Sequence, residues 1–480
     1  MLHIQNYING QLCPPQSGLW LNNYNPALGS VFAQVPNSGA SDVDAAVMAA
    51  KNALPQWAAL TAAERAGYLL RIAGLIEEHL EALATDEVTD NGKTITQARE
   101  VDIPRAASNF RFFAEAVTQF KKETFKTSDT IHNEVLRQPL GVVAAISPWN
   151  LPLYLFTWKI APALATGNTV VAKPSEITPL TAFRLSELCI KAGLPPGVLN
   201  IVHGEGGSTG NALIQHKQIK AITFTGSTAV GKHIASVAAP QLKKISLELG
   251  GKNPALVFAD CDVERTVKEL VRASFSNQGE ICLCSSRLLV QDAIFETFKN
   301  AFVAQAKAMP VGNPMLPETR VGAIVSKTHF DKIGYYLQLA REEGGTILCG
   351  GEPVNPGGAM EQGWFVPPTV IEGLNNQCRT NREEIFGPVV TLIPFKTEEE
   401  AIALANDNDY GLSATIWTTD TERAQRVAQQ VEAGVIWVNC WLVRDLRTPF
   451  GGMKNSGVGR EGGDEALRFF TEPKNVCTRE

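Results

Sequence analysis

The chain has 480 residues, of which 44% are hydrophobic and 19% charged, and its formal net charge is −6. This length predicts more than one domain, and the composition is typical of a soluble globular protein. A negative charge without long basic runs argues against nucleic acid as a partner. We find no signal peptide and no run of about 18 apolar residues, so we expect a cytoplasmic protein without a membrane partner.

Nine cysteines are spread along the chain, and only Cys282 and Cys284 lie close together in sequence. The odd number and the scattered spacing predict reduced thiols and no disulfide framework. No second pair of Cys or His residues has the spacing of a zinc site, so we expect no metal.

Apolar residues at helical spacing predict three helices in the first part of the chain, at 41–54, 61–84 and 93–121. The second of these begins with a capping box, Thr61-Ala62-Ala63-Glu64. Residues 125–139 then have the pattern of two extended stretches. These form either a simple hairpin excursion or a strand at a subunit interface.

From Gly141 onward, short β-rich runs alternate with helical ones. Strands are predicted at 142–146, 169–172, 198–202 and 221–224, with helices near 153–165, from Pro179 and from Ser227. A second series has strands at 253–258 and 287–290, helices near 262–275 and 295–308, and later elements to about 440. Such alternation is typical of parallel sheets with crossover helices. We therefore predict an α/β fold with two α/β domains in series.

Three residues have the chemistry of a covalent active site. Cys282 offers a thiol nucleophile, and Glu248 offers a carboxylate that could act as its base. Asn150 follows a predicted strand, where its amide could donate to a developing oxyanion. Each has a plain alternative: a small apolar core cysteine, a buried salt-bridged glutamate, and an asparagine that caps the next helix. The residues alone leave these alternatives open.

Two turns have features of a nucleotide site. Gly226 and Ser227 follow an apolar strand and open a helix, whose free N–H groups favour a phosphate, although an ordinary helix cap is as frequent. Lys173 and Glu176 follow another strand, where they could hold ribose hydroxyls; taken singly, Glu176 is more often a surface acid. The glycine-rich run 204–210 lacks the Rossmann spacing and the later acid, so we interpret it as a loop.

Seven motifs, in order and over essentially the whole chain, resemble the aldehyde dehydrogenase superfamily. They are Pro148-Trp149-Asn150, Lys173-Pro174-Ser175-Glu176, Phe224-Thr225-Gly226-Ser227, Glu248-Leu249-Gly250-Gly251-Lys252, Asn277-x-Gly279 before Cys282, Glu384-Ile385-Phe386-Gly387-Pro388, and Pro449-Phe450-Gly451-Gly452. The resemblance implies an NAD-binding domain with a five-stranded parallel sheet (1–124 and 140–248), an α/β catalytic domain (249–440) and a small bridging oligomerisation domain (125–139 and 463–480). It also implies a homodimer or homotetramer.

The resemblance further implies a reaction. Cys282 would attack an aldehyde to give a thiohemiacetal, with its oxyanion held by the Asn150 amide and the Cys282 N–H. Hydride transfer to NAD would leave a thioester, which water activated by Glu248 would hydrolyse. The implied cofactor-binding residues are Pro148, Trp149, Lys173, Ser175, Glu176, Gly226, Ser227, Leu249, Glu384 and Phe386. Among them Glu384 would hold the nicotinamide ribose, and Glu176 favours NAD over NADP.

The substrate is suggested by Glu280, which stands where most of the family has Gln. With the runs 102–105 and 441–450, it resembles the branch that oxidises 2-aminomuconic and 2-hydroxymuconic semialdehydes. Such substrates carry a carboxylate, which arginine holds in bidentate fashion. Arg105 and Arg444 are the candidates, with Arg111 and Arg447 behind them; surface or helix-pairing arginines are the alternative.

Several other functions stay open at this point. Succinic semialdehyde, betaine aldehyde or a broad range of aldehydes could be the substrate instead. A CoA-acylating enzyme fits less well because such enzymes typically lack the glutamate base. A non-catalytic structural member of the fold would not need an intact Cys282, Glu248 and Asn150.

Overall fold

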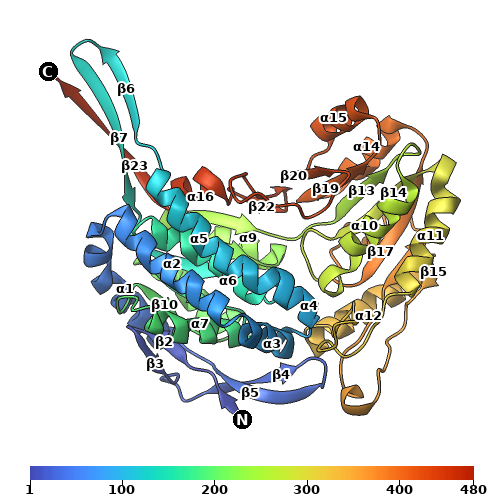
Figure 1. Ribbon diagram of the computed structural model, residues 1–480, viewed down its shortest axis with the longest axis horizontal. Helices are drawn as coiled ribbons and strands as arrows, with labels where there is room; N and C mark the ends of the chain where they lie inside the picture. Colours follow the sequence, from blue (N-terminus) through green and yellow to red (C-terminus); the bar gives the residue numbers. More distant parts are fainter.

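The computed structural model describes residues 1–480, which form two α/β lobes and a projecting β-ribbon (Figure 1). A small sheet near the N-terminus has the order β1 (Leu2–His3), β5 (Ser30–Pro36), β4 (Trp20–Asn25). None of the helices combines the length and the apolar character that crossing a bilayer requires.

The first lobe is built on an eight-stranded sheet. Its order is β22 (Gly457–Val458), β12 (Lys244–Glu248), β11 (Ile219–Thr225), β8 (Val142–Ile146), β9 (Thr169–Lys173), β10 (Leu199–Ile201), β2 (Asn6–Ile8), β3 (Gln11–Cys13). The five strands from β12 to β10 are parallel, as expected. Along the chain, β9 and β10 are added on one side of β8, and β11 and β12 are then added on its other side. The crevice between the carboxyl ends of β8 and β11 is therefore the place where such sheets bind ligands.

Helices cover both faces of this sheet. They are α1 (Ala40–Ala59), α2 (Ala62–Glu78), α3 (Leu80–Asn91), α5 (Ile103–Gln119), α6 (Pro152–Ala165), α7 (Leu180–Lys191), α8 (Asn211–Gln215) and α9 (Thr228–Ala238). The single helix predicted at 61–84 is wrong, because His79 leaves the helical region (φ −102°, ψ 19°). The break lets α2 pack against α5 while α3 packs against α7.

The helix predicted at 93–121 starts at Ile95 and is not uniform. After α4 (Ile95–Gln97), residues Ala98–Asp102 form a π-helical turn that runs directly into α5. Gly92, with φ 85°, ends α3 just before it. Single π-turns inside helices occur often at functional sites.

The second lobe has a seven-stranded sheet, parallel except for β15. Its order is β15 (Thr346–Cys349), β16 (Thr369–Glu372), β17 (Val389–Phe395), β14 (Ser285–Gln291), β13 (Asn253–Val257), β19 (Ser413–Trp417), β20 (Val435–Val438). Its helices are α10 (Val263–Phe275), α11 (Phe295–Lys307), α12 (Lys327–Glu342), α13 (Arg379–Arg382), α14 (Glu398–Asn406) and α15 (Thr421–Gln430). A two-stranded pair, β18 (Tyr410–Gly411) and β21 (Met453–Lys454), lies beside it.

The projecting ribbon consists of β6 (Glu123–Ser128), β7 (Ile131–Pro139) and β23 (Thr471–Arg479), all antiparallel (Figure 1). The two extended stretches predicted near 125–139 are thus a hairpin. Residues 463–469, which the predicted bridging domain included, form α16 (Gly463–Phe469) instead. This helix packs against α5 and α6, so the C-terminal strand of the ribbon begins only at Thr471.

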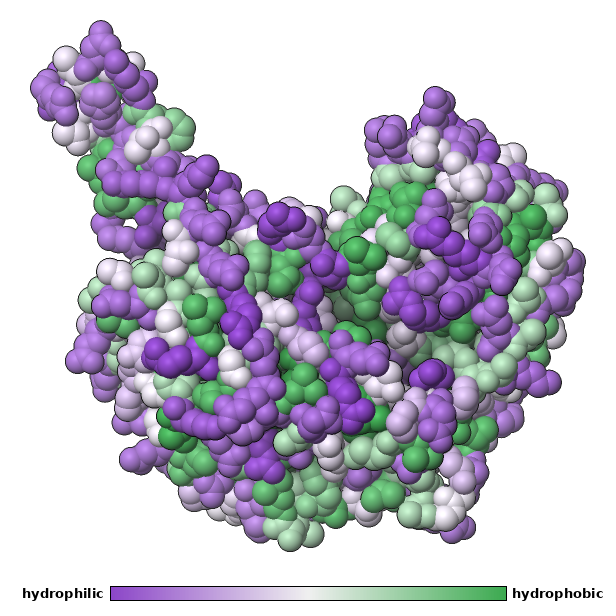
Figure 2. Space-filling view, in the orientation of Figure 1, coloured by the Kyte–Doolittle hydropathy of each residue, from purple (hydrophilic) through white to green (hydrophobic).

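The two large sheets are joined end to end, through the inner strands β12 and β13. Only residues 249–252 separate the end of β12 from the start of β13. The carboxyl edge of the first sheet therefore faces the amino edge of the second. Figure 2 shows a hollow between the lobes, with apolar residues gathered around it.

Candidate active site

The turn that carries Cys282 is strained. Asn277 and Gln278 have φ values of 51° and 56°, and Gly279 follows with 71°. Left-handed backbone at a residue with a side chain costs about 1–3 kcal/mol and is found mainly at functional sites. A Cβ atom on Gly279 would lie 2.2 Å from the carbonyl oxygen of Gly387, so only glycine fits there.

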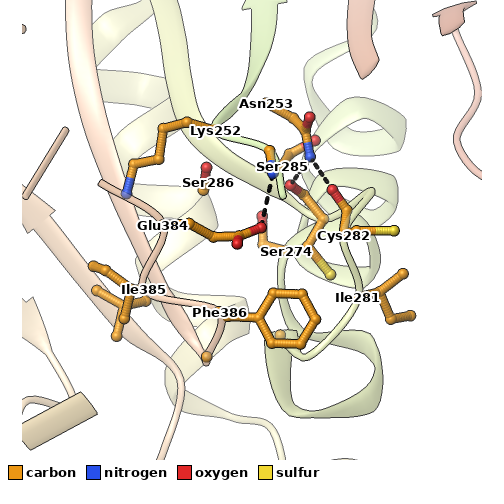
Figure 3. A pocket seen from close by; sticks show the side chains of 15 residues that line it. Lys252, Asn253, Ser274, Ile281, Cys282, Ser285, Ser286, Glu384, Ile385 and Phe386 are labelled. Carbon is orange, nitrogen blue, oxygen red and sulfur yellow. Dashed lines mark hydrogen bonds between the residues drawn. The ribbon is translucent and has the colours of Figure 1, made fainter. Parts of the chain in front are cut away.

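The other side of this turn is tied to β13. Asn253 donates through Nδ2 to the carbonyl oxygens of Cys282, at 2.7 Å, and of Cys284, at 2.9 Å (Figure 3). The register Asn253–Ser285 places Cys282 just before β14, at the amino edge of the second sheet. The thiol thus sits on a rigid turn and not on a free loop.

Three cavities meet at Cys282, which is half-buried. One extends toward Glu248 and Arg444, a second toward Trp149 and Phe386, and a third, in Figure 3, toward Glu384. This position does not fit a cysteine that merely fills the core.

In the protein without bound ligands, the surroundings of Cys282 favour the neutral thiol. Burial raises the pKa of Cys282 far above the ordinary 9.0, and the carboxylates of Glu384 and Glu248 raise it further. Arg444 acts in the opposite direction. Since the thiolate is the reactive form, this thiol needs a base or a change of surroundings before it attacks.

Glu248 is the last residue of β12 and has no ion pair. Both of its carboxylate oxygens are buried without a hydrogen-bond partner. Burial raises its pKa well above 4.5, and the nearby Glu461 adds to the shift. A carboxyl group with a raised pKa in a cavity is suited to proton transfer, and the alternative of a salt-bridged glutamate does not apply.

Lys159 and Glu461 lie in this region and were missed by the sequence reasoning. Lys159 Nζ donates to Glu461 Oε1 at 2.8 Å, and Thr223 donates to the same oxygen at 3.2 Å. Glu461 lines the cavity of Glu248. The available signal was that Lys159 is the only charged residue of the otherwise apolar α6.

Asn150 lies between β8 and α6 but does not cap the helix. The N-cap position is Leu151, and no side chain caps it. Asn150 Nδ2 donates instead to the carbonyl oxygen of Glu280 at 2.9 Å, which leaves its second N–H free. The backbone N–H of Cys282 also makes no backbone hydrogen bond. Both residues line one cavity, so two donors are available for an oxyanion.

The ten predicted cofactor residues all line two adjoining cavities at the switch point of the first sheet. Ser227 is the N-cap of α9 and accepts a hydrogen bond from the Val230 N–H. Lys173 Nζ lies 3.0 Å from Glu176 Oε2. Burial acts to raise the pKa of Glu176, but Lys173 and hydrogen bonds lower it below the ordinary value. The groove therefore presents a helix N-terminus, a lysine and an ionised acid.

The inner end of the groove is shaped around Glu384. Its Oε1 accepts from the Gly251 N–H at 2.8 Å, and a Cβ atom on Gly250 would lie 2.3 Å from its Oε2. The Phe386 ring meets the Trp149 ring edge-on at 5.2 Å.

Two further residues of this end, His329 and Lys332, were not predicted. The His329 ring lies 5.0 Å from that of Trp149, and Lys332 Nζ donates to the Glu384 carbonyl oxygen. No sequence motif marked them.

Arg444 and Arg105 lie on the other side of Cys282. Arg444 lines both the cavity of Glu248 and an outer vestibule, and Arg105 lines the same vestibule. Neither forms a salt bridge, and Arg105 Nε and Nη2 are buried without a partner. They rest on aromatic rings: Arg444 Cζ is 3.9 Å from the Phe450 ring centre, and Arg105 Cζ is 5.3 Å from that of Tyr154.

The other residues considered for the substrate are already paired or lie elsewhere, although Arg447 lines the same vestibule as Arg105 and Arg444. Arg111 is paired with Glu77 on the surface, and Arg447 is paired with Asp445. Glu280 is fully buried outside the substrate cavity, where its Oε1 accepts from the Val325 N–H at 3.2 Å. Glu280 therefore indicates the branch of the family by resemblance alone, because its carboxylate does not face the substrate.

The neutral state of the thiol gives a testable pH dependence. In the NAD-free protein, alkylation of Cys282 by iodoacetamide should be slow at pH 7 and still rising at pH 9, because a raised pKa leaves the thiolate scarce until higher pH. The rate is followed by peptide mass spectrometry, with the exposed Cys477 as internal control. A plateau for Cys282 at or below pH 8 would contradict the assignment.

Comparisons with known proteins agree with this site. The model of the aldehyde dehydrogenase family matches residues 14–476. A 2-aminomuconic semialdehyde dehydrogenase of Danio rerio is 50% identical, covering 100% of this chain and 98% of that protein. A 2-hydroxymuconic semialdehyde dehydrogenase of Pseudomonas sp. (strain CF600) is 45% identical, with 100% of both covered.

Solved structures give the same result for the fold. The crystal structure of PnpE in complex with nicotinamide adenine dinucleotide is 42% identical, has a TM-score of 0.97, and the match covers 99% of this chain and 97% of that one. The predicted fold is thus confirmed. Motifs, architecture and relatives agree, and the chain belongs to the aldehyde dehydrogenase family.

Proposed function

We propose that this protein is an NAD-dependent dehydrogenase that oxidises 2-aminomuconic or 2-hydroxymuconic semialdehyde to the dicarboxylic acid. The observation that carries the proposal is the pair Arg105 and Arg444, two arginines without salt bridges beside the cavity that ends on Cys282 and Glu248. A substrate with an aldehyde at one end and a carboxylate at the other fits this arrangement. The names of the full-length relatives favour the same substrates.

The residues of the site account for the first half of the reaction. The Cys282 S–H bond breaks and its proton passes to water, the sulfur forms a C–S bond with the aldehyde carbon, and the carbonyl oxygen becomes an oxyanion. The free N–H groups of Asn150 and of the Cys282 backbone stabilise that charge. NAD, when bound, supplies the acceptor for the hydride that leaves this carbon. The product on the enzyme is a Cys282 thioester.

Glu248 serves the second half. It removes a proton from a water molecule, whose oxygen attacks the thioester carbon; the C–S bond breaks, the acid departs, and Cys282 is left as a thiolate that takes up a proton from solvent. A base with a raised pKa holds this proton readily. The pair Lys159–Glu461 lies in the same region and offers a route by which the proton leaves the buried site.

NAD fits the groove in charge and in space. The N-terminus of α9 suits a pyrophosphate, and the ionised Glu176 beside Lys173 suits a ribose with two free hydroxyls. Gly250 leaves the room that Glu384 needs in order to reach the second ribose.

The Glu176 carboxylate should repel the 2′-phosphate of NADP. We expect Glu176→Gln to raise kcat/KM for NADP relative to NAD about tenfold, which corresponds to about 1.4 kcal/mol. Steady-state kinetics with both nucleotides measure this ratio, and Glu187→Gln, on the surface of α7, is the control. An unchanged ratio of kcat/KM for NADP to kcat/KM for NAD would show that Glu176 does not contact the ribose.

The ribbon is the proposed bridging element. Its outer strands β6 and β23 each have one unpaired edge and carry the exposed side chains of Phe125 and Val476. Pairing of such an edge with a second copy would give a homodimer or homotetramer. The division into an NAD-binding, a catalytic and a bridging domain and the cytoplasmic location also remain predictions.

The arginine pair is tested with two aldehydes that differ in the carboxylate. We expect Arg105→Ala and Arg444→Ala each to lower kcat/KM for 2-hydroxymuconic semialdehyde about 10- to 100-fold, the range of a lost hydrogen bond to a charged group. 2,4-Hexadienal, an uncharged dienal with the same number of carbons, should lose less than about threefold in Arg105→Ala, because it makes no carboxylate contact. In Arg444→Ala it should lose less than the semialdehyde does, but not nothing, because Arg444 also lowers the pKa of Cys282.

Arg111→Ala removes a surface arginine that pairs with Glu77, and we expect no effect on either aldehyde. The reaction is followed as NADH formation at 340 nm. Equal losses on both aldehydes, or no loss on either, would overturn the proposed carboxylate site. A parent enzyme that oxidised hexadienal better than the semialdehyde would overturn the proposed substrate.

A further inference from the structure

A fully buried lysine lies directly behind Asn150. The side chain of Lys93 is 0% exposed, and it follows Gly92 at the end of α3. Its Nζ donates to the backbone carbonyl oxygen of Asn150 at 3.1 Å and to a carboxylate oxygen of Asp102. A buried charge is costly and is retained only where it is paired. One of its N–H groups donates to Asn150, the residue whose side-chain amide would stabilise the oxyanion.

Asn150 is held at both of its polar ends. Its carbonyl oxygen accepts from Lys93 and, at 3.1 Å, from Asn277 Nδ2, while its side-chain amide donates to Glu280. The preceding carbonyl, that of Trp149, accepts from Asn91 and from Thr178. Lys93 supplies the only charged group among these contacts.

Asp102 is held in turn. Gln97 donates to its second carboxylate oxygen at 3.1 Å, and Asp102 is the last residue of the π-helical turn before α5. The other acid near the lysine is Glu87, 3.6 Å from Nζ. Burial raises the pKa of Glu87 to about 7, with Lys93 opposing the shift. Asp102 is thus the closer of the two acids and the direct counter-ion of Lys93.

We infer that Lys93 is a positioning residue that holds the Asn150 amide where the oxyanion forms, and that Asp102 holds Lys93 in place. Lys93 lines none of the cavities that meet at Cys282, so it acts through Asn150, whereas Asp102 also lines the cavity of Cys282 and Glu248. An oxyanion donor is effective only at hydrogen-bond distance from the developing charge, and a small displacement removes much of its effect. This inference rests on the proposed thiohemiacetal mechanism.

The test is a double-mutant cycle between this ion pair and Asn150. Lys93→Met and Asp102→Asn are combined, so that the lysine is removed together with its closest counter-ion and only Glu87 loses a partner, and are introduced into the parent and into Asn150→Ala. The first turnover of NADH formation is measured at saturating NAD with hexanal, an uncharged aldehyde that does not depend on the arginine pair.

In the parent, the combined change should slow the first turnover about 10- to 100-fold, as expected for a misplaced catalytic group. In Asn150→Ala it should have less than about a twofold effect, because the group that it positions is already gone. The Kd for NAD and the KM for hexanal should stay within about twofold of the parent values.

A matched control is Lys243→Met. Lys243 is also buried and donates to two carbonyl oxygens, of Ile214 and His216, but it lies before β12, at the opposite end of that strand from Glu248. We expect this change to leave the first turnover unaltered. If the combined variant does not fold, which a melting curve shows, Asp102→Asn alone is used in the same cycle.

Equal losses in the two backgrounds would show a general structural role and overturn the inference, as would full activity of the variant in the parent background. Both results leave the proposed function intact. A parent that forms no NADH from any aldehyde would instead overturn the proposed function, and the positioning role would fall with it.

Discussion

The end-to-end arrangement of the two large sheets determines where the acid, the thiol and the cofactor groove lie. The link of residues 249–252 is too short to allow a separation of β12 and β13. It brings Glu248, at the carboxyl end of one sheet, to the cavity of Cys282, at the amino end of the other. The link also contains glycine where space is short: a side chain on Gly250 would displace Glu384 from the cofactor groove. The acid, the thiol and the cofactor groove are therefore fixed by one connection.

Burial at this junction controls the charge of the reacting groups. Cys282 and Glu248 both have raised pKa values, mainly through desolvation; Glu384 and Glu248 add to the shift of Cys282, and Glu461 adds to that of Glu248. The resting site thus avoids two adjacent negative charges. Arg444 opposes both shifts.

Local patterns predicted most of the fold. The alternation of β-rich and helical runs indicated both parallel sheets, because hydrophobic periodicity is a local property of the chain. No glycine or proline marks the break at His79 in the sequence. The break follows from tertiary packing, because α2 packs against α5 and α3 packs against α7. The helix α16 within the predicted bridging range 463–480 was not foreseen for a similar reason, since its packing against α5 and α6 is not a local property of the chain.

The candidate site was predictable only in part. The motif residues were found because each lies within a short run of sequence that resembles the family. Lys159 and Glu461 are 302 positions apart, and no local pattern links them. Lys93 could not be found either, because its contacts with Asn150 and Asp102 exist only after the helices have packed. Glu280 shows the reverse case: it marks the branch of the family, yet its carboxylate contacts Val325 and not the substrate cavity.

The central claim is that Cys282 carries the acyl group and Glu248 releases it. The direct measurement is the mass of the Cys282 peptide after Glu248→Gln has been incubated with NAD and 2-hydroxymuconic semialdehyde and quenched in acid. The account predicts a peptide that is heavier by the acyl group, held as a thioester on Cys282. An unmodified Cys282 in a variant that still forms NADH, or an acyl group on Cys284, would contradict it.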